Sequence, residues 1–339
     1  LRQLGLAVLE FENTYRALPS AAWVGDDRLR ENPSRCEGLG SDSELGTRFA
    51  RNGCFDMQGK FGGPNVSWLV SVMPFLEEQA LYDQFDFNVP LQAQLPRPGG
   101  IAPYANTVAA LLCPSDGSRS APNYSGTGAG PGWNEVAARG GMARSNYAAY
   151  ASAVHIDHFK SRAGALGGFE VGSREGQRIS KVVDGVSKTL LATEVRVLDR
   201  EWDSRGVWAA PFPGASLIAL DWHAIDSGHP NPAPHYVPDT DYDPATVAFP
   251  NSESYADVAI LAPGFDADDA SQQGMPVQSY TAANGFLGAA PRSRHVGGVN
   301  GVALDGHVGF LSDDIDDHAF AYLVAVQDRR PSDISRFLR

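Results

Sequence analysis

Hydrophobic positions at the start of the chain repeat with the period of a helix. They are separated alternately by three and four residues, which places them on one face of an α-helix. This apolar face consists of Leu1, Leu4, Val8, Phe11, Tyr15 and Leu18. The pattern predicts an amphipathic helix over residues 1–18, ended by Pro19. Because no capping residue precedes Leu1, we expect this helix to continue upstream.

Further apolar patterns predict a mixture of short helices and strands. The segment 67–85 has a broad apolar face and contains Pro74, which is expected to kink or interrupt a helix. Other segments are rich in strand-forming residues or show helical spacing. We predict a strand over 145–154, a turn or short helix leading into a strand over 178–195, a strand over 205–211, and a last helix over 316–327.

The clearest hairpin pattern lies within residues 297–314. Asp305 and Gly306 form an Asp-Gly pair, which favours the positive φ angles of a two-residue type I′ turn. The flanking apolar positions are Val302, Leu304, Val308 and Phe310. The pattern therefore predicts two antiparallel strands joined at Asp305-Gly306.

Composition adds long irregular connections to this picture. The chain has 36 Gly and 23 Pro among 339 residues, and its hydrophobic fraction of 43% is sufficient for a buried core. Two polar segments, 20–65 and 213–280, are predicted to be large loops or insertions. The formal charge of −13 disfavours binding to nucleic-acid phosphates. The sequence contains no run of 18 apolar residues and therefore predicts no membrane-spanning helix.

The three cysteines suggest one structural bridge. Cys36 and Cys54 lie in a Gly- and Asn-rich stretch, where a disulfide would stabilise the loop by about 3 kcal/mol in the chain-entropy model. Two unpaired thiols are the alternative, because spacing does not determine connectivity. Cys113 is left over, either as a buried thiol or with a partner upstream of Leu1.

Acidic residues in the long insertion are candidate calcium ligands, and no other cofactor is expected. Carboxylates in flexible loops provide the hard oxygen ligands that Ca²⁺ prefers. The candidate ligands are Asp239, Asp241, Asp243, Asp266 and Asp268. The segments lack the glycine and distal glutamate of an EF-hand, so a solvated acidic loop is the alternative.

The histidines suggest a further alternative, which is a metal-dependent hydrolase. His155 and His158 flank Asp157, and Asp221, His223, His229 and His235 follow in the insertion. On a strand, His155 and His158 would point to opposite faces, which argues against joint ligation. The chain contains no His-Glu-x-x-His and no Cys-x-x-Cys sequence.

Six segments, in consistent order, resemble one protein family. They are LRQLGLAVLEFENTYRALP, SWLVSVMPFLEEQALYDQF, LLCPSD, SNYAAYASA, VVDGVSKTLLATE and SRHVGGVNGVALDGHVGFL. In the last segment His295 is followed by nine residues and then Asp305-Gly306. The chain thus resembles the large bacterial group of pilin-like proteins whose C-terminal domain is named for this His-x9-Asp-Gly spacing.

The resemblance implies a fold and a role. It implies an α+β, type IV pilin-like headgroup over residues 1–339, with the N-terminal helix packed on an antiparallel sheet and with large loop insertions. Its function would be non-catalytic, as a subunit or assembly component of a type IV pilus, a type II secretion pseudopilus or a related extracellular filament. The implied partners are further copies, other pilins and secretion proteins, with contact to the inner membrane only through an upstream helix. Its location would be the periplasm, the cell surface or an extracellular filament.

The resemblance assigns no chemistry to the hairpin motif over 295–311. The sequence shows no carboxylate or cysteine partner for His295 at ligand spacing, so we expect this side chain to hydrogen-bond and fix the loop before the hairpin. A contact or processing determinant is the functional alternative. Asp305 and Gly306 are expected to serve the turn.

A carbohydrate-binding or adhesive module is the second functional interpretation. Trp133, Trp202, Trp208 and Trp222 would stack on sugar rings if they were exposed. Packing in the core is the simpler expectation, because Trp is mostly buried. An adhesive role is compatible with a pilin-like scaffold.

Overall fold

The N-terminal helix is present and is shorter than predicted. The computed structural model describes residues 1–24, 64–117, 120–127, 133–153, 164–166, 169–171, 173–212, 214–221, 247–279 and 288–326. Helix α1 spans Arg2–Tyr15. It ends before Pro19 because Arg16 adopts the left-handed conformation, with φ of 59°, and its N–H donates to the Glu12 carbonyl. Leu18 is buried beyond the helix end.

Several predictions fall outside the described residues. These are the disulfide between Cys36 and Cys54, the calcium ligands Asp239, Asp241 and Asp243, and the histidine candidates His155, His158, His223, His229 and His235. Trp222 and Asp157 also lie outside them.

The second predicted helix is interrupted at Pro74, as its sequence indicated. Strand β2 (Val66–Ser67) leads into α5 (Trp68–Val72), which continues as the 3₁₀ turn η1 (Met73–Leu76) and is followed by α6 (Gln79–Tyr82). Proline removes one backbone donor, and the chain turns at Glu77, whose φ is 64°. Phe75 packs against Phe11 of α1, with ring centroids 5.9 Å apart.

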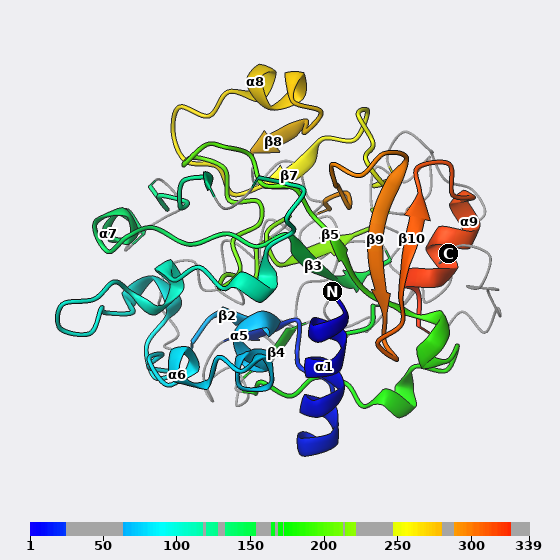
Figure 1. The fold of residues 1–339 in the computed structure, drawn as a ribbon, viewed down its shortest axis with the longest axis horizontal. Coiled ribbons are helices and arrows are strands. Elements are labelled where there is room, and N and C mark those ends of the chain that lie inside the picture. The colour runs from blue at the N-terminus through cyan, green and yellow to red at the C-terminus, as the bar shows by residue number, and fades with distance from the viewer. Residues whose placement is uncertain are drawn as a thin grey trace, which may run out of the picture.

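A five-stranded sheet forms the centre of the molecule (Figure 1). Its strands, in spatial order, are β10 (Val308–Ser312), β9 (Gly298–Ala303), β5 (Leu190–Glu194), β3 (Tyr147–Ser152) and β6 (Leu217–Ala219). The first four strands pair antiparallel, whereas β6 pairs with β3 in parallel. The sheet is therefore mixed, which corrects the expectation of a purely antiparallel one. The parallel edge comes from a strand within the 213–280 segment.

Both faces of this sheet are covered. Along β3, Tyr147, Ala149 and Ala151 belong to the core that contains α1, whereas Ala148 and Tyr150 belong to the core on the opposite face. This alternation follows from the two-residue period of a strand. The second core is closed by α9 (Asp317–Val324), which is capped by the Asp316 side chain. Helices and sheet pack as separate layers, so the fold class is α+β.

The predicted hairpin is present, with a different turn. Val308 pairs with Val302, and the Gly306 N–H donates to the Ala303 carbonyl. Gly306 has a φ of 84°, and Asp305 does not have a positive φ, so the turn is not type I′. It is a three-residue connection in which a turn is followed by one left-handed glycine. The Asp305 carboxylate accepts from the His307 N–H at 2.9 Å and stabilises the turn.

The remaining elements are short. A second sheet contains β2, β1 (Ala22–Val24) and β4 (Phe169–Val171), and a third pairs β7 (Asp257–Ala259) with β8 (Val277–Ser279). The further helices are α7 (Asn134–Ala138), α8 (Ala267–Gln272) and the 3₁₀ turns η2 (Leu91–Ala93), η3 (Pro103–Ala105), η4 (Ala109–Leu111), η6 (Ile179–Lys181) and η7 (Val186–Lys188). The strand predicted over 205–211 is absent, and Val207 makes only an isolated bridge to Arg144. Its apolar residues are buried in the core without pairing along a strand.

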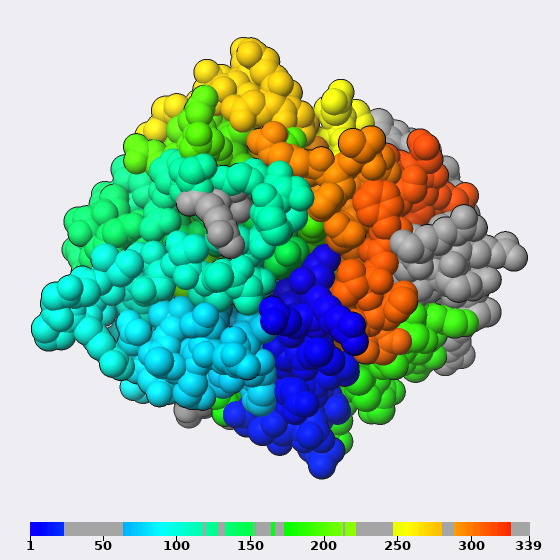
Figure 2. All heavy atoms as spheres, viewed as in Figure 1, coloured from blue at the N-terminus to red at the C-terminus, as the bar shows by residue number. Residues whose placement is uncertain are grey.

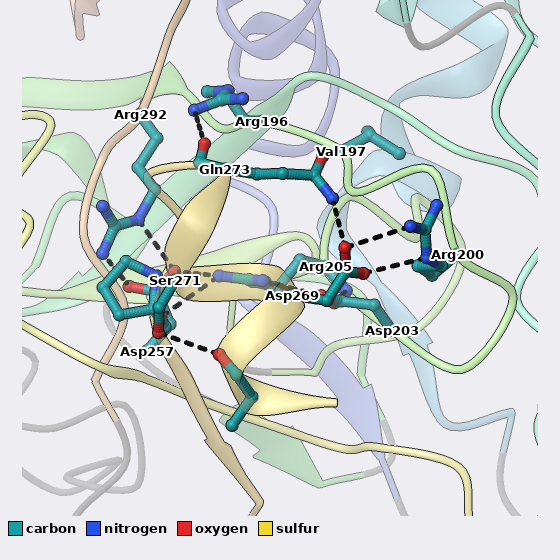
Figure 3. Close-up of polar contacts among 12 residues, drawn as sticks. Arg196, Val197, Arg200, Asp203, Arg205, Asp257, Asp269, Ser271, Gln273 and Arg292 are labelled. Atoms are coloured by element: carbon teal, nitrogen blue, oxygen red, sulfur yellow. Dashed lines mark hydrogen bonds and ion pairs between the residues drawn. The ribbon is translucent and has the colours of Figure 1, made fainter. Parts of the chain in front are cut away.

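A buried ion network joins the unit of β7, α8 and β8 to the rest of the fold (Figure 3). Arg205 donates to Asp203 at 2.7 Å and to Asp257 at 2.8 Å, and Arg292 donates to the same Asp257 oxygen at 2.9 Å. Burial alone would raise the pKa of Asp257, but the charges of Arg292 and Arg205 hold it below its usual value. Part of the 213–280 insertion is thus integrated through paired charges.

Helix α1 lies at the surface with one side uncovered. Figure 2 shows it between the 64–90 region and the β9–β10 hairpin. Within the described residues, no helix combines the length and the apolar character needed to cross a bilayer.

Candidate functional site

Cys113 is positioned by the turn that follows η4. Its backbone N–H donates to Oδ1 of Asn146 at 2.8 Å, and Asn146 lies directly before β3. The amide nitrogen of Asn146 donates to Oδ2 of Asp116 at 2.6 Å and to the Val195 carbonyl at 3.0 Å. One amide side chain therefore joins the Cys-Pro-Ser-Asp turn to the ends of β3 and β5.

Glu194 is the last residue of β5 and is only 3% exposed. Its Oε2 accepts from the backbone N–H of Asn300 at 2.8 Å and from the Asn300 amide nitrogen at 3.1 Å. Both donors lie on β9, the neighbouring strand. These two hydrogen bonds fix the carboxylate and direct its other oxygen, Oε1, away from β9 toward Cys113 and His295.

His295 completes a three-residue cluster. Its Nε2 lies 3.1 Å from Oε1 of Glu194 and 3.8 Å from Sγ of Cys113, and the thiol lies 3.3 Å from the same Oε1. The backbone N–H of His295 donates to Oγ of Ser293 at 3.0 Å, which holds the loop before β9. The sequence shows no carboxylate or cysteine at ligand spacing from His295, but the structure places one of each beside it. The His295 side chain hydrogen-bonds to Glu194, whereas the contact within the loop is made by the backbone N–H of His295.

Burial and hydrogen bonding act on the Cys113 thiol in opposite directions. Burial raises the pKa of the Cys113 thiol; a backbone hydrogen bond from Ser115 opposes this, and the charge of Glu194 adds to it. A reactive cysteine requires a lowered pKa. In a catalytic triad the carboxylate orients the imidazole through the nitrogen that does not face the nucleophile. Here Glu194 and Cys113 both face Nε2, so the triad geometry is absent.

The start of α1 lies beside this cluster. Leu1, directly before α1, lies near Glu194 and Cys113. Tyr147 pairs directly with Glu194 across β3 and β5, and burial raises the pKa of its hydroxyl. The cluster thus sits where the sheet, the Cys-Pro-Ser-Asp turn and α1 meet.

A buried carboxylate supports the Cys-Pro-Ser-Asp turn from the other side. Asp116 accepts from the Val197 N–H at 3.0 Å, and its Oδ1 lies 3.4 Å from Nε of Arg294 and 3.7 Å from Nε of Arg196. Burial raises the pKa of Asp116, while the Val197 and Asn146 hydrogen bonds lower it. This residue anchors the turn and offers no oxygen to the cluster of Cys113, Glu194 and His295.

The apolar face predicted for the N-terminal helix packs against the core. Leu4, Val8 and Phe11 are buried within α1, and Leu1 and Tyr15 pack at the margin of the same core. Leu18 belongs to that core from beyond the helix. Gly5 is also buried, and a Cβ there would lie 2.8 Å from Cγ2 of Val302.

Two of the predicted calcium ligands, Asp266 and Asp268, lie within the described residues. Asp266 caps α8 by accepting from the Asp269 N–H at 3.0 Å. Asp268 is exposed in the first helical turn, and Asp269 pairs with Arg200 at 2.9 Å. The calcium site stays a prediction, because its other ligands lie outside the described residues.

Tryptophan packing bears on the sugar-binding interpretation. Trp208 and Trp133 are buried, and the indole N–H of Trp208 donates to the Asn106 carbonyl at 3.0 Å. Trp202 is half-buried beside Phe265. Neither Trp133 nor Trp208 presents a ring face to solvent.

Sequence reasoning missed the site because its members are far apart along the chain. Cys113 and Glu194 are separated by 81 positions, and Glu194 and His295 by 101. A signal was nevertheless present, since each residue lies in one of the segments that carry the family resemblance: LLCPSD, VVDGVSKTLLATE and SRHVGGVNGVALDGHVGFL. The structure brings these three segments, together with SNYAAYASA, to one place.

Fold and site together define an α+β protein in which several of the sequence motifs converge on one largely buried polar junction. A family model described as "Protein of unknown function (DUF1559)" matches residues 1–318. The chain belongs to this family. The match spans the 213–280 segment, so that segment lies within the family region. No curated protein and no solved structure gave a match.

Proposed function

We propose that this chain is the headgroup of a type IV pilin-like filament subunit, with a structural and non-catalytic role. The observation that carries the proposal is the arrangement of α1. One face of this helix is buried against the central sheet and the α5–η1 segment, while the opposite side lies along the molecular surface. A helix that links a headgroup to a filament core needs these two faces.

The outer side of α1 supports this role. Leu6 is 50% exposed on a helix whose inner face is already packed. Leu9 lies next to it and is partly buried beside Gly306 of the hairpin. A single exposed leucine does not by itself define an interface, so Leu6 serves here as the position at which helix contact would be detected. Filament assembly would cover Leu6.

The remaining parts of the proposal follow from this role. Self-association occurs through the N-terminal helix, and other pilins or type II secretion proteins are the further partners. The chain acts in the periplasm, at the cell surface or in an extracellular filament, and reaches the inner membrane through a helix upstream of Leu1. The non-catalytic role is supported by the missing triad geometry at Cys113, Glu194 and His295.

Chemical labelling of the full precursor in its host tests the filament role. The variants Leu6→Cys and Leu95→Cys each add a thiol at an exposed position, because Leu95 is 67% exposed. In surface filaments sheared from cells, a membrane-impermeant maleimide should label Leu95→Cys and leave Leu6→Cys protected. In the isolated headgroup both variants should react, and the parent chain gives the background of the native cysteines. Equal labelling in the sheared fraction, or recovery of dispersed monomers alone, contradicts the proposal.

The coding sequence upstream of Leu1 provides an independent check. The proposal expects a short basic leader, a prepilin peptidase site and about 20 apolar residues that continue α1. Upstream sequence that encodes a different element excludes the pilin role.

A further inference from the structure

We propose that Cys113, Glu194 and His295 form a binding site for one divalent transition-metal ion, with Zn²⁺ as the best-matched ion. The three residues offer one sulfur, one carboxylate oxygen and one imidazole nitrogen within 4.8 Å of one another. Thiolate and imidazole are ligands that select zinc and related metals over calcium or magnesium. The inference does not depend on the filament role.

The separations between the three ligand atoms match a zinc polyhedron. With metal–sulfur bonds of about 2.3 Å and metal–nitrogen and metal–oxygen bonds of about 2.0 Å, tetrahedral zinc places sulfur about 3.5 Å from the other two ligands and nitrogen about 3.3 Å from oxygen. The observed separations are 3.3 Å for sulfur to oxygen, 3.8 Å for sulfur to nitrogen and 3.1 Å for nitrogen to oxygen. Each agrees to within about 0.3 Å, so small side-chain shifts suffice to bind the ion.

Groups around the cluster hold its ligands in place. Asn300 binds Oε2 of Glu194 through two hydrogen bonds and leaves Oε1 for the metal. Asn146 holds the backbone of Cys113, and Ser293 holds that of His295. Metal sites depend on such supporting hydrogen bonds, which orient the ligands before the ion binds.

Exposure and charge suit a site with three protein ligands. The side chains of Glu194 and His295 are 4% and 31% exposed, so water reaches the cluster from the histidine side and can supply the fourth ligand. A thiolate and a carboxylate together balance the two charges of Zn²⁺. The bound ion would join the Cys-Pro-Ser-Asp turn, the end of β5 and the loop before β9, next to the start of α1.

Metal binding to the purified chain tests the proposal. After dialysis against a chelator and addition of Zn²⁺, elemental analysis should give one ion per chain, and the Tm should rise. Co²⁺ should bind in place of zinc and give the charge-transfer absorption of a cobalt–thiolate bond. The variants Cys113→Ser and His295→Gln should each bind Zn²⁺ at least about tenfold more weakly, and Asn300→Ala about tenfold more weakly through loss of orientation.

Matched variants distinguish binding at this cluster from binding elsewhere on the chain. His307→Gln changes an exposed histidine of the same hairpin, and the double variant Cys36→Ser/Cys54→Ser removes the other two cysteines. Both should retain the zinc and the cobalt–thiolate absorption.

Circular dichroism of each variant without metal establishes that it is folded. If Cys113→Ser does not fold, His295→Gln, at a partly exposed position, provides the test. Any one of three results overturns the proposal. They are the absence of stoichiometric metal, a cobalt–thiolate absorption that persists in a folded Cys113→Ser variant, and an unchanged affinity of His295→Gln for Zn²⁺. These outcomes are measured on the headgroup in solution, so they are separate from any failure to find filaments.

Discussion

At the scale of single residues, Asp257 shows how a buried charge is retained in this fold. It is 1% exposed and lies between the guanidinium groups of Arg205 and Arg292, while its Oδ1 also accepts from the Ala290 N–H (Figure 3). A buried carboxylate without such partners would be strongly unfavourable. Removal of its charge leaves two buried arginines with one fewer acceptor each.

The Asp257→Asn variant should therefore unfold more easily at neutral pH. We expect a loss of about 3–5 kcal/mol in the free energy of unfolding, the usual result of breaking a buried pair on one side. Denaturant unfolding at pH 7 measures this change. Asp268→Asn, at an exposed position of the same segment, should change the stability by less than about 0.5 kcal/mol.

The same residue makes a prediction about pH. The arginines lower the pKa of Asp257 in the folded state, so the unfolded chain takes up this proton more readily. The stabilisation is fully present above the unfolded pKa of about 3.9 and is lost as pH falls through the lower folded pKa. The stability difference between the parent chain and Asp257→Asn should thus be constant from pH 7 to about pH 5 and shrink below about pH 4. A difference that grows in acid would contradict this assignment.

At the scale of elements, α1 and the β9–β10 hairpin approach each other at Gly5. A Cβ on Gly5 would lie 2.8 Å from Cγ2 of Val302 and 3.0 Å from the backbone Cα of Gly306. Val302 is β-branched, and Gly306 is fixed by the turn, so neither neighbour moves easily. The glycine lowers helix propensity and permits close packing.

The Gly5→Ala variant separates these two effects. Alanine favours the helix by about 1 kcal/mol over glycine, whereas overpacking costs about 1–3 kcal/mol. Because one contact is with backbone, we expect a net destabilisation of about 1 kcal/mol. In a double-mutant cycle measured by denaturant unfolding, Val302→Ala should cost less in the Gly5→Ala background than in the parent chain. Additive effects would show that the contact with Val302 does not limit the packing.

The elements also differ in how far the sequence predicted them. The α1 face, the break at Pro74 and the β9–β10 hairpin depend on local spacing, and all three are present. The 205–211 segment was predicted as a strand because it is apolar, but its Gly206 has a φ of 77°, which no strand residue adopts, and the Arg205 carbonyl accepts from the Arg144 side chain. The type I′ turn was wrong because only Gly306 takes a positive φ.

At the scale of the whole molecule, the sheet requires cover on both faces. Phe320 of α9 is fully buried and packs edge-on against Tyr150 of β3, with ring centroids 6.1 Å apart. The family match ends at residue 318, so much of this helix lies beyond it. The packing shows that the folded unit of this chain extends past the family boundary.

The Phe320→Ala variant tests whether α9 belongs to the cooperative fold. Removal of a buried phenylalanine should cost about 3–5 kcal/mol, through lost burial and the cavity that remains. Val183→Ala, at a side chain that is 57% exposed, is the matched control and should have little effect. Denaturant unfolding monitored by circular dichroism measures both. A cost below about 1 kcal/mol would mean that α9 unfolds separately from the sheet.

The sequence by itself determined the features that depend on neighbouring positions: the apolar face of α1, the interruption at Pro74 and the hairpin around Asp305-Gly306. Its ordered motifs also indicated a large family of unknown function, to which the chain belongs. Only the tertiary structure decided that Cys113, Glu194 and His295 meet. Their contact follows from the pairing of β5 with β3 and β9 and from the Asn146 bridge to the Cys-Pro-Ser-Asp turn. Periodicity in a sequence reports which face of an element is buried, because that face is set by local geometry. It does not report which buried faces come together, since strand pairing and packing join positions that are far apart in the chain.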